Sequence, residues 1–213
     1  MISFADELRR IMLLKNPRPL TFDIEHIFKT MQLFKTEKYV SRATLCRELQ
    51  LGEGSVKTII SHMKKSGYAS SIKSGTFLLE KGHRLIDQIS QHLPAEIKFN
   101  ETKYLPLFNH AILLRNGVNY VVDGMQQRDF AIRKGAQTAL TVLYQKSQFL
   151  LAIKEKPYLI DDEKLEKNLT KLRPEDDDAL IITSANSEIV AEMAAKSSAL
   201  YTLQNIRALN LRI

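Results

Sequence analysis

Two apolar helical stripes separated by a very short, glycine-containing turn constrain the fold of this chain more than any other feature. The turn is Leu51-Gly52-Glu53-Gly54, which is too short and too rich in glycine to continue a helix. Ser41 opens the helix before the turn. We expect Ser55 to cap the helix after it, which ends at Ser66-Gly67. The spacing therefore predicts a helix-turn-helix.

Signals on both sides of this helix pair extend the prediction to a whole domain. They are a helical arm over residues 2–14, a helix capped by Thr21, strands Tyr68–Lys73 and Thr76–Leu79 joined by Ser74-Gly75, and a helix from Glu80 to about Leu93. Three helices, a hairpin and a helix in this order predict a winged helix-turn-helix domain over residues 1–95.

The net charge is concentrated in the same part of the chain. The 213 residues include 31 Lys+Arg and 24 Asp+Glu, a formal net charge of +7. Residues 1–98 carry +6 of it, and residues 41–84 alone carry +5. Such asymmetry between two halves of a chain indicates contact with nucleic acid or with a membrane surface.

The helix that follows the Leu51–Gly54 turn, the third helix after the N-terminal arm is set aside, carries most of the predicted DNA contacts. Its buried stripe leaves short hydroxyls and cations facing outward, where a helix in the major groove meets base edges and phosphates. We expect the start of the second helix and the hairpin tip to reach phosphates. The alternative is a merely solvated helix face. The predicted DNA-binding residues are Arg42, Thr44, Ser55, Lys57, Thr58, Ser61, His62, Lys65 and Lys73.

Several runs of residues resemble one protein family. They are Thr21-Phe22, Leu51-Gly52-Glu53-Gly54-Ser55-Val56-Lys57-Thr58-Ile59-Ile60, Leu79-Glu80-Lys81-Gly82 and Met125-Gln126-Gln127-Arg128-Asp129-Phe130-Ala131-Ile132-Arg133-Lys134-Gly135-Ala136. Over most of residues 19–203 the chain resembles archaeal winged-helix proteins with a C-terminal domain of unknown function. The resemblance implies a transcriptional regulator. Relatives usually carry a threonine between the leucine and the glutamate of the third run, and this chain lacks it.

The second half predicts a different kind of domain. Residues 94–107 mix Pro94, Asn100 and Pro106 with charges, so residues 96–107 are expected to be a linker, followed by an α/β domain over 108–213. Its predicted elements are strand His110–Arg115, helix Val118–Lys134, strands Thr138–Tyr144 and Gln148–Ile153, helix Asp161–Leu172, strand Ala179–Thr183 and helix Ser187–Leu203. The β-α-β-β-α-β-α order favours a ferredoxin-like sheet with an added helix, although another three-layer packing has the same order. The fold class expected for the whole chain is α+β.

Polar side chains of this second domain form a candidate ligand site. Groups at strand ends that lead into helices bind anions well. The candidates are Arg115, Gln127, Arg128, Asp129, Ser184 and Asn186. Asp129 and Arg133 are also spaced for a helix-stabilising pair, and Ser184 or Ser187 for a helix cap. A solvated acidic turn is the favoured interpretation of Asp176-Asp177-Asp178.

The remaining motifs exclude several classes of function. The histidines and the lone Cys46 lack metal-ligand spacing, and neither catalytic nor phosphate-binding loop motifs are present. We therefore expect no metal, no cofactor and no enzymatic activity, and a cytoplasmic protein without a membrane span. The expected partners are double-stranded DNA, a second copy of the chain and a small anionic effector. The alternatives are an enzyme acting on a small anionic metabolite, with an accessory winged helix, and a protein-binding module of the transcription machinery.

Overall fold

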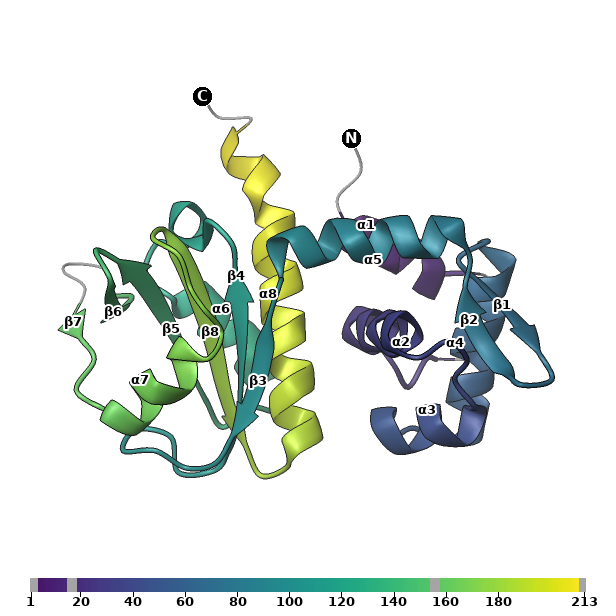
Figure 1. The fold of residues 1–213 in the computed structure, drawn as a ribbon, viewed down its shortest axis with the longest axis horizontal. Helices are drawn as coiled ribbons and strands as arrows, with labels where there is room; N and C mark the ends of the chain where they lie inside the picture. Colours follow the sequence, from purple (N-terminus) through teal and green to yellow (C-terminus); the bar gives the residue numbers. More distant parts are fainter. Residues whose placement is uncertain (1–3, 15–18, 154–157, 211–213) are drawn as a thin grey trace. The chain divides into compact units, whose positions relative to one another are not determined.

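The computed structural model describes residues 4–14, 19–153 and 158–210, which form two compact units (Figure 1). The first unit spans residues 1–89 and the second residues 90–213, so the division falls within the helix over Glu80–His92. Each unit combines helices with one antiparallel sheet. The α+β class is therefore confirmed.

The first unit consists of helices followed by a two-stranded sheet and a further helix. In chain order its elements are α1 (Phe4–Met12), α2 (Ile24–Thr36), α3 (Arg42–Leu49), α4 (Glu53–Lys65), β1 (Ala69–Ile72), β2 (Gly75–Leu78) and α5 (Glu80–His92). The predicted apolar stripes form its core: Ile27 and Met31 of α2, Leu45 of α3, and Ile59 and Met63 of α4 are fully buried. Cys46 of α3 is half-buried.

The caps of these helices correct two of three predictions. Ser41 caps α3 as expected, because its Oγ accepts a hydrogen bond from the Thr44 amide at 3.0 Å. Asp23, rather than Thr21, caps α2, where it forms a capping box with His26. Ser55 was also wrong as a cap, since α4 begins at Glu53 and the backbone of Gly52 occupies the N-cap position. The turn between α3 and α4 is thus shorter than the glycines suggested.

The hairpin between β1 and β2 differs from the prediction by one residue. Ile72 pairs with Gly75, so the two-residue turn is Lys73-Ser74 and not Ser74-Gly75. Gly75 has another role, because a Cβ atom there would lie 2.8 Å from the backbone oxygen of Val40. The glycine therefore lets β2 approach the chain before α3, to which Thr76 is hydrogen-bonded.

The second unit is a six-stranded antiparallel sheet between helices. Its elements are β3 (Glu96–Phe99), β4 (Phe108–Leu114), the 3-10 helix η1 (Gly117–Tyr120), α6 (Met125–Arg133), β5 (Thr138–Gln145), β6 (Gln148–Leu151), β7 (Tyr158–Leu159), α7 (Glu163–Thr170), β8 (Asp178–Ala185) and α8 (Glu188–Asn210). Helices α6 and α8 lie on one face and α7 on the other (Figure 1). Leu165 and Leu169 of α7 pack on Leu180 of β8, while Ala194 of α8 packs on Ala131 of α6.

The ferredoxin-like strand arrangement was wrong. The strand order is β3-β4-β8-β5-β6-β7, so β8 lies between β4 and β5, where a ferredoxin-like sheet would have β6. The burial of the strands explains this choice. All eight residues of β8 are buried, and such a strand needs a neighbour on each side, whereas β6 has only four residues and pairs with β5 and the short β7.

Two further expectations for this unit are corrected. Residues 96–107 are not simply a linker, because Glu96–Phe99 forms the edge strand β3 and pairs with β4. The predicted helix over 118–134 is instead η1 followed by α6. The interruption follows from Gly124, whose left-handed φ of 72° ends the intervening loop and whose backbone packs against Thr141 of β5.

Candidate nucleic-acid interface

Helices α3 and α4 are joined by a connection of three residues, Gln50 to Gly52. Helix α3 ends at Leu49, its C-cap Gln50 has a left-handed φ of 51°, and α4 begins at Glu53. Leu49 and Val56 are buried beside this connection. Arg42, at the start of α3, lowers the pKa of Glu53, although the hydrogen bond from Lys57 to Glu53 is the largest cause.

Exposed cations occupy α3, α4 and the hairpin turn. They are Arg42, Arg47, Lys57, Lys64, Lys65 and Lys73. On α4, Lys57, Ser61, Lys64 and Lys65 follow the i, i+4, i+7, i+8 spacing of a single helix face, opposite the buried stripe of Ile59 and Met63. Lys57 lies 3.1 Å from Glu53. Because both side chains are exposed, this pair contributes little stability and can exchange partners.

The predicted hydroxyl groups of this region mostly have partners within the protein. The Oγ atoms of Ser55 and Thr21 lie 2.5 Å apart, and Thr58 donates to the Gly54 carbonyl at 2.9 Å. The hydroxyl of Thr44 lies 3.0 Å from the capping oxygen of Ser41. These bonds orient the side chains, and half-buried Ser61 remains on the same helix face as Lys57.

His62 is not at this surface, which corrects the prediction for that residue. Its side chain is only 5% exposed, and its ring meets the ring of Phe22 edge-on with centroids 6.3 Å apart. Burial lowers the pKa of His62, against the opposing influence of the nearby backbone groups of Met12 and Ile11. The reason is that α1 covers a second side of α4, which a single apolar stripe does not reveal.

The candidate ligand residues of the second unit do not converge on one site. Arg115 follows β4, whereas Ser184 ends β8, and antiparallel strands place their carboxyl ends at opposite edges of the sheet. Arg128, Asp129 and Asn186 are exposed on α6 and before α8.

Arg115 and Gln127 have structural partners instead. Arg115 donates to the fully buried Asp178 at 2.7 Å, and Asp178 also accepts the backbone amides of Asn116 and Glu175 at 2.9 and 2.8 Å. Asp178 thereby joins the loop after β4 to the loop before β8, at one end of these two strands. Gln127 is buried between α6 and α8, where it donates to Thr202.

A buried charge cluster in the second unit escaped the sequence reasoning. Lys196 of α8 is fully buried, with its Nζ 2.6 Å from Glu96 Oε1 and 3.2 Å from Glu192 Oε1. His110 Nε2 lies 3.3 Å from Glu96 Oε2. Burial would raise the pKa of Glu96, but Lys196 and His110 outweigh it and lower the pKa to about 2. The only sequence signal was the i, i+4 pair Glu192–Lys196 in an alanine-rich helix.

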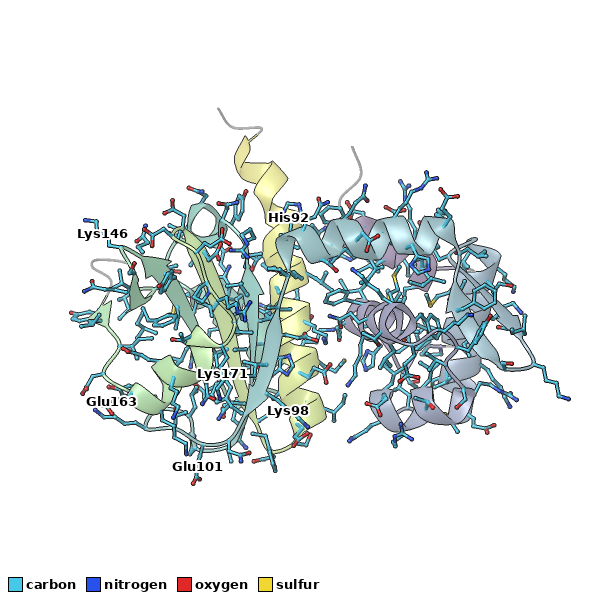
Figure 2. All side chains as sticks on the ribbon, in the orientation of Figure 1. His92, Lys98, Glu101, Lys146, Glu163 and Lys171 are labelled. Carbon is cyan, nitrogen blue, oxygen red and sulfur yellow. The ribbon has the colours of Figure 1, made fainter. Side chains whose placement is uncertain are left out.

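A small cavity lies beside the loop between β3 and β4. Its volume is about 230 Å³, and its lining residues are Lys98, Phe99, Asn100, Phe108, Asn109 and Glu188. Lys98, labelled in Figure 2, pairs with Glu188 at 2.8 Å. Asn109 Oδ1 and Ser184 Oγ, on directly paired residues of β4 and β8, are buried and have no hydrogen-bond partner within the described residues.

Two kinds of feature are absent from the described residues: a metal-ligand cluster and a membrane-spanning helix. Within these residues, no group of three or more His, Cys, Asp or Glu side chains is arranged to hold a metal ion. Asp176 and Asp177 instead accept hydrogen bonds from Ser147 and Gln145. Among the helices over the same residues, none has the length and apolar character needed to cross a bilayer.

Comparisons with known proteins support the second domain and the fold. Residues 106–203 match a family model described as "Domain of unknown function (DUF4443)", which confirms the expected domain of unknown function in this half. The structure is similar to a hypothetical protein from the archaeon Pyrococcus horikoshii OT3, with a TM-score of 0.71 and 22% sequence identity. That likeness covers 87% of this chain and 95% of the other. No curated protein matches the chain.

Proposed function

We propose that this protein is a DNA-binding transcriptional regulator whose first unit is a winged helix-turn-helix. One observation carries the proposal: the face of α4 opposite its buried stripe presents Lys57, Ser61, Lys64 and Lys65 to solvent. A helix with such a face, preceded by a short turn and followed by a hairpin, suits the major groove, where phosphates and base edges need hydrogen-bond donors.

Each element of the first unit would have a defined part in the complex. Helix α4 enters the major groove, and the N-terminus of α3 with Arg42 meets a backbone phosphate. Lys73, in the β1–β2 turn, reaches the neighbouring phosphate backbone. His62 makes no base contact, because it is buried against Phe22. His62 instead helps to pack α4 within the first unit.

The second unit would dimerise the protein or sense an effector. It carries almost none of the net charge, since residues 90–213 sum to +1, so DNA is not its natural partner. A dimer binds two half-sites when its two α4 helices are separated by one turn of DNA, about 34 Å. A small anionic effector would act by changing that separation.

Fluorescence anisotropy with labelled genomic duplexes, titrated at several salt concentrations, tests the proposal. The double variant Lys64→Gln, Lys65→Gln is expected to bind roughly tenfold or more weakly and to lower the salt slope by about 0.9 for each phosphate that is no longer neutralised. The matched control is Lys164→Gln, Lys167→Gln, which removes two exposed lysines from helix α7.

The control variant is expected to bind like the unmodified protein, because α7 belongs to the second unit. Equal reductions in affinity for the two double variants would mean that only overall charge matters. Such a result, or an absence of saturable and salt-sensitive binding, would overturn the proposal.

A further inference from the structure

Glu53 is an acidic side chain in a region where exposed cations predominate. It is the first residue of α4 and is 71% exposed. A carboxylate at this place repels phosphates and so lowers the affinity for any DNA brought against α4. An exposed glutamate is ionised at neutral pH, and Lys57 and Arg42 lower the pKa of Glu53 further. An acid kept ionised at the start of this helix calls for a role other than phosphate binding.

The Glu53–Lys57 pair presents an acceptor beside a donor. The carboxylate Oε2 and the ammonium Nζ are 3.1 Å apart, on successive turns of one helix face. The major-groove edge of a C·G base pair carries the complementary groups side by side: the N4 donor of cytosine and the O6 and N7 acceptors of guanine. Carboxylates accept from cytosine N4, and lysine donates to guanine O6 and N7. These side-chain preferences favour a C·G base pair over an A·T pair, in which the adenine N6 donor also lies beside an acceptor, thymine O4.

The position of the pair on α4 agrees with base contact. In helix-turn-helix proteins the N-terminal residues of the second helix contact base edges. Glu53 occupies the first helical position and Lys57 lies one turn later, whereas Lys64 and Lys65 lie in the last turn. The later cations are thus placed for phosphates and the earlier pair for a base edge.

We propose that Glu53, held by Lys57, selects a C·G base pair in the DNA site. The inference rests on the proposed function, since it takes α4 as the helix that enters the major groove. Glu53 accepts a hydrogen bond from cytosine N4, and Lys57 donates to the guanine of the same pair. The cost in general DNA affinity is offset by a preference for C·G at that position.

A matched pair elsewhere in the same unit separates base reading from helix stabilisation. Glu80 is the first residue of α5, is exposed, and forms an i, i+4 ion pair with Arg84. An acid in the first turn and an i, i+4 pair stabilise α4 and α5 in the same way. Glu80→Gln therefore reproduces the structural consequences of Glu53→Gln without altering α4.

The experiment selects duplexes from a randomised pool with the full-length protein and with Glu53→Gln, Glu53→Ala and Glu80→Gln, and then measures affinities for the selected sites. Circular dichroism establishes that each variant is folded. Glu53→Gln is expected to change one preferred base from cytosine to adenine, because glutamine pairs with adenine N6 and N7. The change in relative affinity at that position should be about tenfold or more.

Glu53→Ala is expected to lose the preference at that one position and to bind unrelated duplexes more tightly, while Glu80→Gln selects the same site as the unmodified protein. If Glu53→Gln and Glu53→Ala both retain the original base at every position, the inference is overturned and the proposed function stands. If the unmodified protein shows no salt-sensitive binding to any duplex, the proposed function itself fails.

Discussion

The two units of the protein use their polar side chains in opposite ways. In the first unit, charged groups of α3 and α4 such as Arg42, Lys57 and Lys65 are exposed. In the second unit, three of the six candidate ligand residues are occupied internally: Gln127 and Ser184 are buried, and Arg115 is paired with the fully buried Asp178. The difference teaches that the same residue types indicate binding only where the fold leaves them accessible to a partner.

The largest expected effect tests whether Asp178 is structural. Asp178→Ala removes the buried acceptor of Arg115 and of two backbone amides, so we expect the free energy of unfolding to fall by about 3–5 kcal/mol. Urea denaturation followed by circular dichroism measures it. The neighbouring exposed Asp176→Ala, which loses one hydrogen bond to Ser147, should cost about 1 kcal/mol or less. Equal effects of the two substitutions would contradict the structural role of Asp178.

The buried charge cluster predicts a loss of stability in acid. The pKa of Glu96 is lowered from 4.5 to about 2 in the folded protein, so its contribution is fully present above about pH 4.5 and is lost as the pH falls toward 2. The contribution is up to about 3 kcal/mol. Glu96→Gln should be less stable at pH 7 and should show a flatter decline between pH 4.5 and 2 in urea titrations. An unchanged slope in this variant would show that Glu96 does not titrate with folding.

A smaller effect on stability distinguishes a buried His62 from an exposed one. His62→Ala removes a ring packed on Phe22, so we expect a loss of about 1–3 kcal/mol in the free energy of unfolding. At temperatures where the variant is folded, its DNA affinity should match that of the unmodified protein. If His62→Ala left stability unchanged and weakened DNA binding, His62 would act at the surface, and its assignment as a buried residue would be wrong.

The smallest effect concerns Ser184. Its Oγ is buried without a hydrogen-bond partner among the described residues, so removing it relieves a desolvation cost. We expect Ser184→Ala to change the free energy of unfolding by less than about 1 kcal/mol, in the stabilising direction, by urea denaturation. A large destabilisation would contradict this expectation, because it would mean that the Ser184 hydroxyl has a stabilising hydrogen-bond partner.

Local signals in the sequence predicted many of the elements correctly. Ser41 caps α3, the helix after Leu79 spans Glu80–His92, and the two strands predicted over residues 138–153 form the β5–β6 hairpin, whose turn is Lys146-Ser147 with both residues at positive φ. These features depend on contacts between residues close in the chain. The caps at Thr21 and Ser55 failed because the helices begin elsewhere: Asp23 forms a capping box at the start of α2, and α4 begins at Glu53 after Gly52, which makes no side-chain cap.

The candidate sites were harder to predict than the elements. The exposed cations of α4 were predicted because their helical spacing from Ile59 and Met63 is local. The burial of His62 was missed because α1, about 50 residues earlier, covers it. The pairing of Lys196 with Glu96 joins residues 100 positions apart, and no pattern within α8 reveals such a partner.

The sequence by itself determined the α+β class, most helices and hairpins, and the concentration of charge in the first unit, because periodicity, caps and composition are properties of neighbouring residues. Only the tertiary structure decided the order of the strands, with β8 placed between β4 and β5. It also decided which polar side chains are buried and which are exposed. Strand order and burial depend on which distant segments can cover one another's apolar surface. That competition is settled by packing across the whole unit and not by any local stretch of the chain.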